Sequence, residues 1–315
     1  MWLYLAALLG LYFLRRWYRE RQTVENLTEK YVFITGCDSG FGNQLARQLD
    51  ARGLRVLAAC LTQQGAEQLG KATSERLQTT LLDVTSTESV AAAAAWAKER
   101  VGNKGLWGLV NNAGIAHPMA PNEWLTKQDF RKVLDVNLLG VIDTTVQLLP
   151  LVKSARGRLV NVASVMGRLA MLGGGYCVAK YGVEAFSDSL RRELHSFGIR
   201  VSIIEPGNFK TSITVNLQEN LQAVWSRVPA EIQESYGQPY FEAVCQGFRE
   251  LFDQAKSSLY PVTDCMEHAL TSRYPRSRYS GGWDAKLYYI PVSYLPTVLA
   301  DYLLMRCGPK PAHAI

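Results

Sequence analysis

The feature that most limits the folds open to this chain is a short apolar strand that runs into a glycine-rich turn and then into a helix. Residues 31–35 read Tyr-Val-Phe-Ile-Thr, an aromatic and β-branched run that predicts a buried strand. The segment 36–42 then holds three glycines, and apolar residues at helical spacing follow in 45–49. A dinucleotide-binding fingerprint requires this order, because the pyrophosphate lies at the N-terminus of the helix.

The residues of this turn each have a part in holding a pyrophosphate. Gly36 allows the tight turn, while Gly40 and Gly42 let the backbone and the helix approach the ligand. The predicted cofactor-binding residues of the turn are Thr35, Gly36, Asp38, Ser39, Gly40, Phe41 and Gly42. A glycine-rich turn without a ligand is the alternative, and the flanking strand and helix argue against it.

Further apolar strands alternate with helical segments along the whole chain. We predict them at residues 55–59, 79–82, 108–110, 158–162 and 201–205. No linker rich in proline, glycine and serine separates two halves. The alternation predicts an α/β fold with a single Rossmann-type, doubly wound parallel sheet of about seven strands, flanked by helices.

Tyr176 and Lys180 lie four residues apart at the start of a predicted helix that ends at Gly198. Residues with this spacing share a helix face, so the phenol and the ammonium should lie close together. A neighbouring cation would lower the pKa of Tyr176 from its usual value near ~10 toward the range of a general base. The pair alone is common on helix surfaces, but Ser164, at the end of strand 158–162, makes a catalytic set the better interpretation.

These residues, together with Asn111-Asn112-Ala113-Gly114 after strand 108–110, resemble the short-chain dehydrogenase/reductase superfamily. The resemblance covers about residues 29–290, which it implies are one catalytic domain. It implies that Tyr176 is the acid/base and that Ser164 hydrogen-bonds the substrate oxygen. Lys180 would hold the nicotinamide ribose and tune Tyr176.

The resemblance also implies the reaction, which passes a hydride between a nicotinamide and an alcohol or ketone carbon without a metal. Asn137 matches the family's helix asparagine that supports a proton relay through water; a polar residue at a helix kink is the alternative. The remaining implied cofactor contacts are Asp83, Val84, Asn111, Asn112, Ala113, Gly114, Pro206, Gly207 and Thr211, with Tyr176 and Lys180.

The second strand bears on the choice between NAD and NADP. A Rossmann site for NAD usually carries an acid about 20 residues beyond the glycines, and residues 60–64 contain none. They contain no Arg or Lys either, so a 2′-phosphate would lack a partner, and Asp38 would repel it. We therefore predict NAD rather than NADP.

The N-terminus predicts contact with a membrane. Residues 1–14 are apolar and uncharged but shorter than a typical span of about 20 residues, and a cluster of arginines follows in 15–21. We predict an uncleaved anchor over residues 1–22; a helix packed on the domain is the alternative. The arginines favour a cytosolic body, whereas the sequon at Asn26 matters only in the lumen, so the orientation stays open.

The net charge of +6 fits a membrane surface better than nucleic acid, because the basic residues form no stripe beside aromatic ones. Residues 291–315 are predicted to form an apolar, membrane-associated tail, with a core or dimer contact as the alternative. Six cysteines fit neither a zinc site nor a disulfide framework, and we expect them to be reduced.

The family resemblance implies that residues 208–262 form a lid over the substrate. Its apolar residues suit a large apolar ligand, and they are Trp225, Tyr236, Tyr240, Phe241, Phe248, Leu251 and Phe252. Ordinary packing of the lid helices is the alternative for each of them.

Residues 1–4, 34–42, 173–176, 186–192 and 282–286 resemble one branch of the superfamily, the microsomal retinol and 3α(17β)-hydroxysteroid dehydrogenases. That branch implies a membrane-bound enzyme of the endoplasmic reticulum that oxidises retinol or a hydroxysteroid with NAD, and the choice between the two substrates stays open. An NADPH-linked reductase of lipid aldehydes or ketones is one alternative, and a catalytically silent dinucleotide- or lipid-binding protein is another. The superfamily commonly forms homodimers through the helix of Tyr176, and this chain gives no independent sign of pairing.

Overall fold

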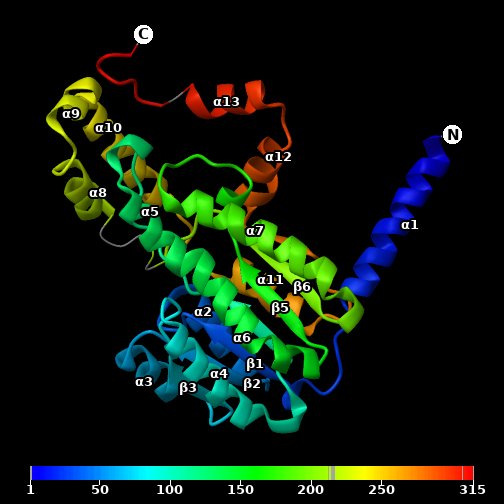
Figure 1. Cartoon of the computed structure of the whole chain (residues 1–315). Helices are drawn as coiled ribbons and strands as arrows, with labels where there is room; N and C mark the ends of the chain where they lie inside the picture. The colour runs from blue at the N-terminus through cyan, green and yellow to red at the C-terminus, as the bar shows by residue number, and fades with distance from the viewer. Residues whose placement is uncertain (1, 212, 214–216, 307, 315) are drawn as a thin grey trace.

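Seven parallel strands form one sheet in the order β3-β2-β1-β4-β5-β6-β7, in a computed structural model that describes residues 2–211, 213, 217–306 and 308–314 (Figure 1). The strands are β1 Tyr31–Thr35, β2 Arg55–Cys60, β3 Leu77–Leu81, β4 Gly108–Asn111, β5 Arg158–Val162, β6 Arg200–Pro206 and β7 Arg278–Gly281. The predicted fold class is confirmed, and each predicted strand is present within two residues of its expected ends.

Helices cover both faces of the sheet (Figure 1). One face carries α2 Gly40–Ala51, α3 Gln63–Lys71 and α11 Tyr260–Thr271. The other carries α4 Thr87–Val101, α6 Gly140–Ser154 and α7 Gly175–Glu193. A further helix, α5 Lys127–Leu134, packs on α7 and joins α6 through a π-helical turn at Asp135–Leu139.

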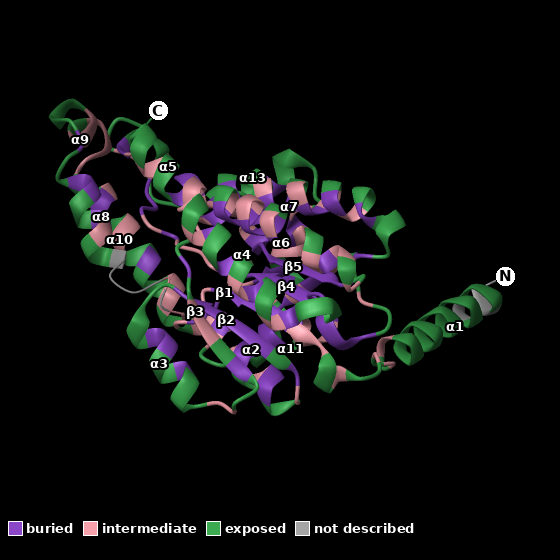
Figure 2. Ribbon diagram, turned by 60° about the horizontal axis from the view of Figure 1, so that its bottom comes forward, coloured by how far each residue is buried: buried purple, intermediate pink, exposed green. Residues whose placement is uncertain are grey.

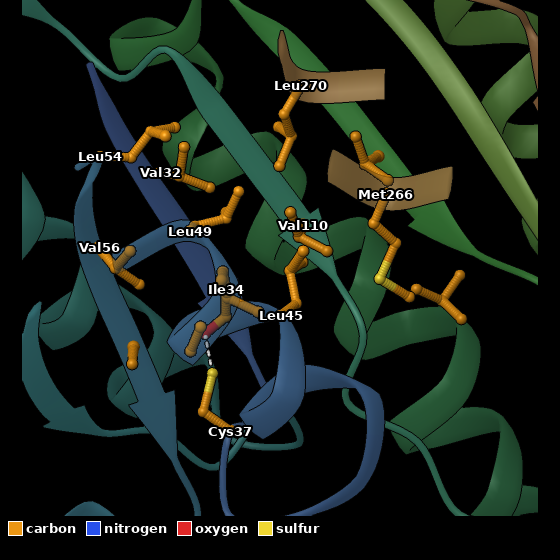
Figure 3. Packing of buried hydrophobic residues seen from close by; sticks show 14 of the residues in the cluster. Val32, Ile34, Cys37, Leu45, Leu49, Leu54, Val56, Val110, Met266 and Leu270 are labelled. Carbon is orange, nitrogen blue, oxygen red and sulfur yellow. Dashed lines mark hydrogen bonds between the residues drawn. The ribbon is translucent and has the colours of Figure 1, made fainter. Parts of the chain in front are cut away.

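The two core layers follow from the alternation of side chains along each strand. Val32 and Ile34 of β1 face the α2 and α11 side, where Figure 3 shows them beside Leu45 and Leu270. Phe33 belongs to the opposite layer. All three β1 side chains are fully buried, and Figure 2 shows the sheet as the buried centre of the molecule.

The strand order fixes where a ligand can bind. From β1 the chain extends the sheet in one direction through β2 and β3, and then β4 pairs with the other edge of β1. The connections that follow β1 and β4 therefore diverge above the carboxyl ends of these strands. Ligands of open α/β sheets bind in the crevice at such a switch point.

The segment predicted to form a lid contains α8 Leu217–Trp225, α9 Ala230–Tyr236 and α10 Gln238–Asp253, which lie at one end of the molecule (Figure 1). The predicted lid segment extends to residue 262, which lies inside helix α11 Tyr260–Thr271. Helix α11 already begins at Tyr260, and Val262 is fully buried against the sheet. The start of the core helix α11 is not marked in the sequence, because no glycine-rich break precedes it at Leu259.

Helix α1, Trp2–Glu20, projects from the body (Figures 1 and 2). The described side chains of residues 4–5 and 7–19 are all exposed, so the alternative of a helix packed on the domain is wrong. Within the described residues, the helix that passes a length and hydropathy test for a membrane span is 127–154 instead. That helix belongs to the body, where it packs on α4, α7 and β4.

The C-terminal segment contains α12 Ile290–Val292 and α13 Thr297–Met305. No break occurs at residue 290, because α12 continues a π-helical turn at Ala285–Tyr289. Val292 and Ala300 are buried against Leu169, while the opposite side of the segment exposes large apolar residues. Beyond α13, Ala312 N donates to Tyr236 O of the lid at 2.9 Å. Within the predicted tail, Cys307 and Ile315 lie outside the described residues.

Candidate active site

A cavity of about 460 Å³ lies at the carboxyl ends of the central strands. Most of the predicted site residues line it: Gly36, Asp38, Ser39, Gly40, Phe41, Asp83, Val84, Asn112, Ala113, Gly114, Ser164, Tyr176, Lys180, Pro206, Gly207 and Thr211. The structure therefore brings the glycine turn and the catalytic set into one space. Thr35, Gly42, Asn111 and Asn137 do not line it.

The glycine turn has the backbone that the motif predicts. Gly36 and Gly40 have φ angles of +69° and +61°, which favour glycine, and α2 begins at Gly40. A Cβ on Gly42 would meet the carbonyl of Gly36 and the side chain of Asn112, so only glycine lets the helix approach this closely. A helix N-terminus at the edge of the cavity fits a pyrophosphate group.

Hydrogen bonds of Thr35 and Asn112 fix the position of the glycine turn. Thr35 Oγ1 accepts hydrogen bonds from the backbone N–H groups of Asn112 and Ala113, each at 3.0 Å. Asn112 Nδ2 donates to Thr35 O at 2.9 Å. Thr35 and Gly42, which we predicted to contact the cofactor, shape the cavity without lining it.

Asn111 is buried behind the cavity, so its prediction as a cofactor contact is wrong. Its Nδ2 donates to Thr145 Oγ1 and to Asn161 Oδ1, both at 2.8 Å. Asn161 in turn donates to Ser187 Oγ of α7 at 2.8 Å. The side chain of Asn111, the last residue of β4, points into the layer between the sheet and the helices. Its hydrogen bond to Asn161, and that of Asn161 to Ser187, tie β4, β5 and α7 together.

The carboxylate of Asp38 lies across the end of β2. It accepts hydrogen bonds from Leu61 N at 2.8 Å, Thr62 N at 2.9 Å and Thr62 Oγ1 at 2.7 Å. The acid that we expected after β2 is missing from that strand, yet the glycine turn supplies a carboxylate at the same place. Sequence spacing could not show this, because the two segments meet only in the folded chain.

Asp83 follows β3 and borders the same side of the cavity. Its Oδ1 accepts from Thr85 N at 2.9 Å and from Thr85 Oγ1 at 2.7 Å, and its own N–H donates to Ser89 Oγ. These bonds fix the turn before α4, so Asp83 and Val84 present a rigid edge to the cavity.

Ser164, Tyr176 and Lys180 meet as predicted. Ser164 follows β5, accepts a hydrogen bond from Met166 N at 3.1 Å, and forms a side-chain hydrogen bond with Tyr176. The Nζ of Lys180 lies 5.5 Å from the centre of the Tyr176 ring and donates to Val162 O at 2.8 Å. Tyr176 lies in the first turn of α7, so one helix positions both groups.

Burial dominates the acidity of this pair. It raises the pKa of Tyr176 to about 12 and lowers the pKa of Lys180 to about 8. The prediction that Lys180 lowers the pKa of Tyr176 is therefore wrong for the protein alone. The ammonium is bound to the carbonyl of Val162, and its charge does not offset the loss of water around the phenol.

Asn137 lies in the π-helical turn between α5 and α6. Its Oδ1 accepts from Ile115 N at 2.8 Å, and its Nδ2 donates to Ile115 O at 2.6 Å. The side chain thus satisfies backbone groups of the loop after β4 and not of the helix itself, so the kink interpretation stays a prediction. A part for Asn137 in a proton relay stays a prediction.

The far side of the cavity is apolar. Of the seven lid residues predicted to face the substrate, Leu251 and Phe252 line it, whereas the others pack into a cluster around Trp124. Sequence reasoning missed further apolar lining residues: Met119, Leu172, Phe209, Ile213 and Tyr289. Phe209 and Ile213 belong to the start of the predicted lid segment, whereas the other three come from separate segments that no sequence signal connects.

Another residue that sequence reasoning missed supports the turn after β6. Asp284 Oδ2 accepts from Asn208 N at 2.7 Å and contacts Gly207 closely. Asp284 belongs to segment 282–286, one of the segments that resemble the family branch.

The cysteines of the described chain are unpaired at positions 37, 60, 177, 245 and 265. Burial raises the pKa of Cys60 to about 12, which leaves that thiol unreactive. Across the described ranges, no group of three or more His, Cys, Asp or Glu side chains could hold a metal ion.

Comparison with known proteins identifies the family of this chain. The profile of the short chain dehydrogenase family matches residues 30–222. Over all of both chains, the sequence is 62% identical to retinol dehydrogenase 7 of Rattus norvegicus and to 17-beta-hydroxysteroid dehydrogenase type 6 of Homo sapiens. The predicted branch of the family is thereby confirmed.

Solved structures show the same fold. A short-chain dehydrogenase from Streptomyces avermitilis matches with a TM-score of 0.69 at 26% identity, over 88% of this chain and 96% of that one. The fold of this family binds a nicotinamide dinucleotide, NAD or NADP. This chain belongs to the short-chain dehydrogenase family and is an oxidoreductase.

Proposed function

We propose that this protein oxidises a membrane-derived lipophilic alcohol, retinol or a 3α- or 17β-hydroxysteroid, with NAD. One observation carries the proposal: Ser164, Tyr176 and Lys180 border a single cavity with the glycine turn at one end and apolar side chains at the other. The relatives named above as retinol and 17-beta-hydroxysteroid dehydrogenases support the choice of substrate class.

The chemistry follows from the positions of the side chains. Tyr176, as a phenolate, accepts the proton of the substrate hydroxyl, and Ser164 donates a hydrogen bond to the same oxygen. Lys180 stabilises the phenolate through its charge. When bound, the nicotinamide supplies the oxidising power by accepting the hydride of the alcohol carbon.

Asp38 supports NAD as the cofactor. Its carboxylate is held by three hydrogen bonds at the end of β2 and lines the cavity. In Rossmann sites an acid at this strand end binds the ribose 2′-hydroxyl, and a fixed negative charge there disfavours a 2′-phosphate. We therefore retain NAD over NADP.

Exposed apolar surfaces support a membrane location, which we propose to be the endoplasmic reticulum. Helix α1 exposes Leu8, Leu11, Phe13 and Trp17, and a 19-residue helix is about 28 Å long. The tail exposes a second apolar surface, formed by Tyr294, Leu295, Val298, Leu299, Tyr302 and Met305. Exposed apolar area of this kind usually marks a membrane or protein contact.

A homodimer is a further proposal. The outer faces of α6 and α7 expose Val146, Val178 and Tyr181, which a second copy would cover. Light scattering of the detergent-solubilised protein tests this, and a monomer at micromolar concentration would contradict it.

The decisive experiment is a panel of retinol isomers and 3α- and 17β-hydroxysteroids, each with NAD and with NADP. We expect turnover of at least one class, with the higher kcat/KM for NAD. A much lower KM for NADPH than for NADH, with reduction of lipid aldehydes, would favour the carbonyl reductase instead.

Tyr176→Phe tests the mechanism in the same assay. The substitution should reduce kcat by about 10³-fold or more, because it removes the proton acceptor, while NAD affinity stays within about threefold. Equal activity of variant and parent would overturn the assignment of Tyr176.

A further inference from the structure

A cluster of buried charges lies one helical turn beyond Lys180. Glu184 of α7 is 6% exposed, and Arg278 of β7 donates to its Oε2 at 2.8 Å and 3.2 Å. Glu205, near the end of β6 and 2% exposed, accepts from Arg168 at 3.1 Å and lies 3.7 Å from Arg278. Two acids and two guanidinium groups thus share one buried space behind the catalytic helix.

Both acids lie against Arg278. Glu184 Oε2 is 2.8 Å from Arg278 Nη2, and Glu205 Oε1 is 3.7 Å from Arg278 Nε. Glu184 Oε1 is buried and receives no hydrogen bond from the donors of the described residues. Two carboxylates in this arrangement need a shared proton, because like charges this close cannot both be ionised without a large cost. Burial and the charge of Glu205 raise the pKa of Glu184 to about 7.

The charge of Glu184 affects the pKa of Lys180. The two residues share a face of α7, four positions apart, and the ammonium of Lys180 donates a hydrogen bond to the Val162 carbonyl at 2.8 Å. Burial lowers the pKa of Lys180, and the charge of Glu184 raises it. Gly167 packs on both residues, since a Cβ there would lie 2.9 Å from Lys180 O and 3.1 Å from Glu184 Cγ.

The charged groups around Glu184 are Arg278, Arg168 and Glu205, together with Asp188, which also lies on α7. Asp188 also binds Arg278, at 3.0 Å, and Arg191, at 3.3 Å. Arg168 stacks on the ring of Tyr294 and forms a hydrogen bond with it.

Helix α5 and the π-helical turn meet the opposite face of α7, where Gly175 contacts Phe130 and Gly182 contacts Leu138. Two of their charged side chains pair elsewhere: Arg131 with Asp135, and Asp129 with Arg227. The others on α5 are Lys127 and Lys132.

We propose that Glu184 and Glu205 form a proton-sharing pair in which Glu184 is the counter-ion that keeps Lys180 charged, so that Glu184 is a positioning residue for the acid/base Tyr176. The assignment rests on the proposed function only in taking Tyr176 as the acid/base. As pH rises, the pair releases its proton, and the added negative charge opposes the loss of the Lys180 proton. The site thus keeps its ammonium over a wider pH range.

Two substitutions separate this role from a merely structural one. Glu184→Gln removes the counter-charge, so the alkaline limb of the kcat profile should move to lower pH by roughly one unit. Glu205→Gln removes the neighbour but leaves Glu184 ionised, so its alkaline limb should stay within about 0.3 pH units of the parent. Glu184→Asp should restore most of the range, and Asp188→Asn, which also loosens Arg278, is the matched control.

A second readout needs no substrate. The absorbance of the Tyr176 phenolate, taken as parent minus Tyr176→Phe with NAD bound, should titrate at higher pH in Glu184→Gln than in Glu205→Gln. If both variants lose activity without moving either limb, or move both limbs alike, the pair is structural and the inference is wrong. If no alcohol is oxidised but the titration shifts as expected, the proposed function fails while the inference stands.

Discussion

At the scale of single residues, burial sets the protonation of Tyr176 and Lys180 in the protein without substrate. It leaves Tyr176 neutral, with a pKa of about 12, and leaves Lys180 with a pKa of about 8. A phenol this weakly acidic cannot act as a base near neutral pH. We therefore expect the phenolate to form only when the positive ring of the oxidised cofactor lies beside it.

Asp38 is the residue on which cofactor choice should depend. Asp38→Asn removes the negative charge at the end of β2, so the ratio of kcat/KM for NADP to that for NAD should rise about tenfold, equivalent to about 1.4 kcal/mol. Steady-state kinetics with both cofactors measure this ratio.

Thr62→Val provides the control for this prediction. It removes one of the hydrogen bonds to Asp38, the 2.7 Å contact from Thr62 Oγ1, but keeps the charge. The ratio should then stay within about twofold of the parent. A change as large as that of Asp38→Asn would mean that loop geometry, not charge, sets the preference.

At the scale of elements, the joint between α1 and the body determines how the projecting helix is held. Glu20, the last residue of α1, accepts a hydrogen bond from Arg276 Nε at 2.7 Å, and its backbone carbonyl lies 2.8 Å from His268 Nε2. Beyond it, Val24 N donates to Thr271 O at 2.8 Å. Arg19 of the helix also lies over the ring of Tyr274, 4.1 Å from its centre, so these contacts at the C-terminal end of α1 hold the helix to the body.

The Glu20–Arg276 pair predicts a pH-dependent loss of stability. Arg276 lowers the pKa of Glu20 from 4.5 to about 2, so the pair stabilises the fold above pH 4.5 and loses this effect as pH falls toward 2. Glu20→Gln should cost about 1 kcal/mol of unfolding free energy at pH 7, and the difference from the parent should shrink at pH 3. Urea unfolding followed by tryptophan fluorescence measures both.

Glu25→Gln is the control, since Glu25 is exposed beside the same joint. Its effect should stay within about 0.5 kcal/mol at both pH values. A difference for Glu20→Gln that persists unchanged at pH 3 would contradict the assignment of the pair.

At the scale of the whole molecule, two apolar surfaces lie outside the sheet and its helices. The first is α1, and the second is the outer side of α12 and α13, whose inner side packs on Leu169. In Figure 1 the free end of α1 and helix α13 both lie toward the top of the view, away from α3 and α4.

Deletion of residues 1–18 tests the anchor while keeping the joint at Glu20 and Val24. The shortened protein should unfold within a few degrees of the parent Tm, because α1 contributes little to the core, and should shift from the membrane pellet to the supernatant. If part stays bound, adding Val298→Asp, at a residue 80% exposed on α13, should release it. A full-length protein that washes off in mild salt would contradict the anchor.

The sequence by itself determined the sheet, the glycine turn and the catalytic set. Each depends on residues near one another in the chain: the β-branched run at 31–35, the glycines that follow it, and the helical spacing of Tyr176 and Lys180. Local backbone preference and side-chain periodicity act over such distances, so they can be recognised without coordinates. The same information placed Ser164 at the end of its strand.

Only the tertiary structure decided the features that depend on distant segments. It placed the carboxylate of Asp38 against the end of β2, turned Asn111 into the core, and brought Glu184 and Glu205 together behind Lys180. It also reversed the predicted acidity of Tyr176, because the loss of water around a buried group depends on everything packed about it. Spacing along the chain carries no record of burial or of contacts between strands, and those set the charges of this site.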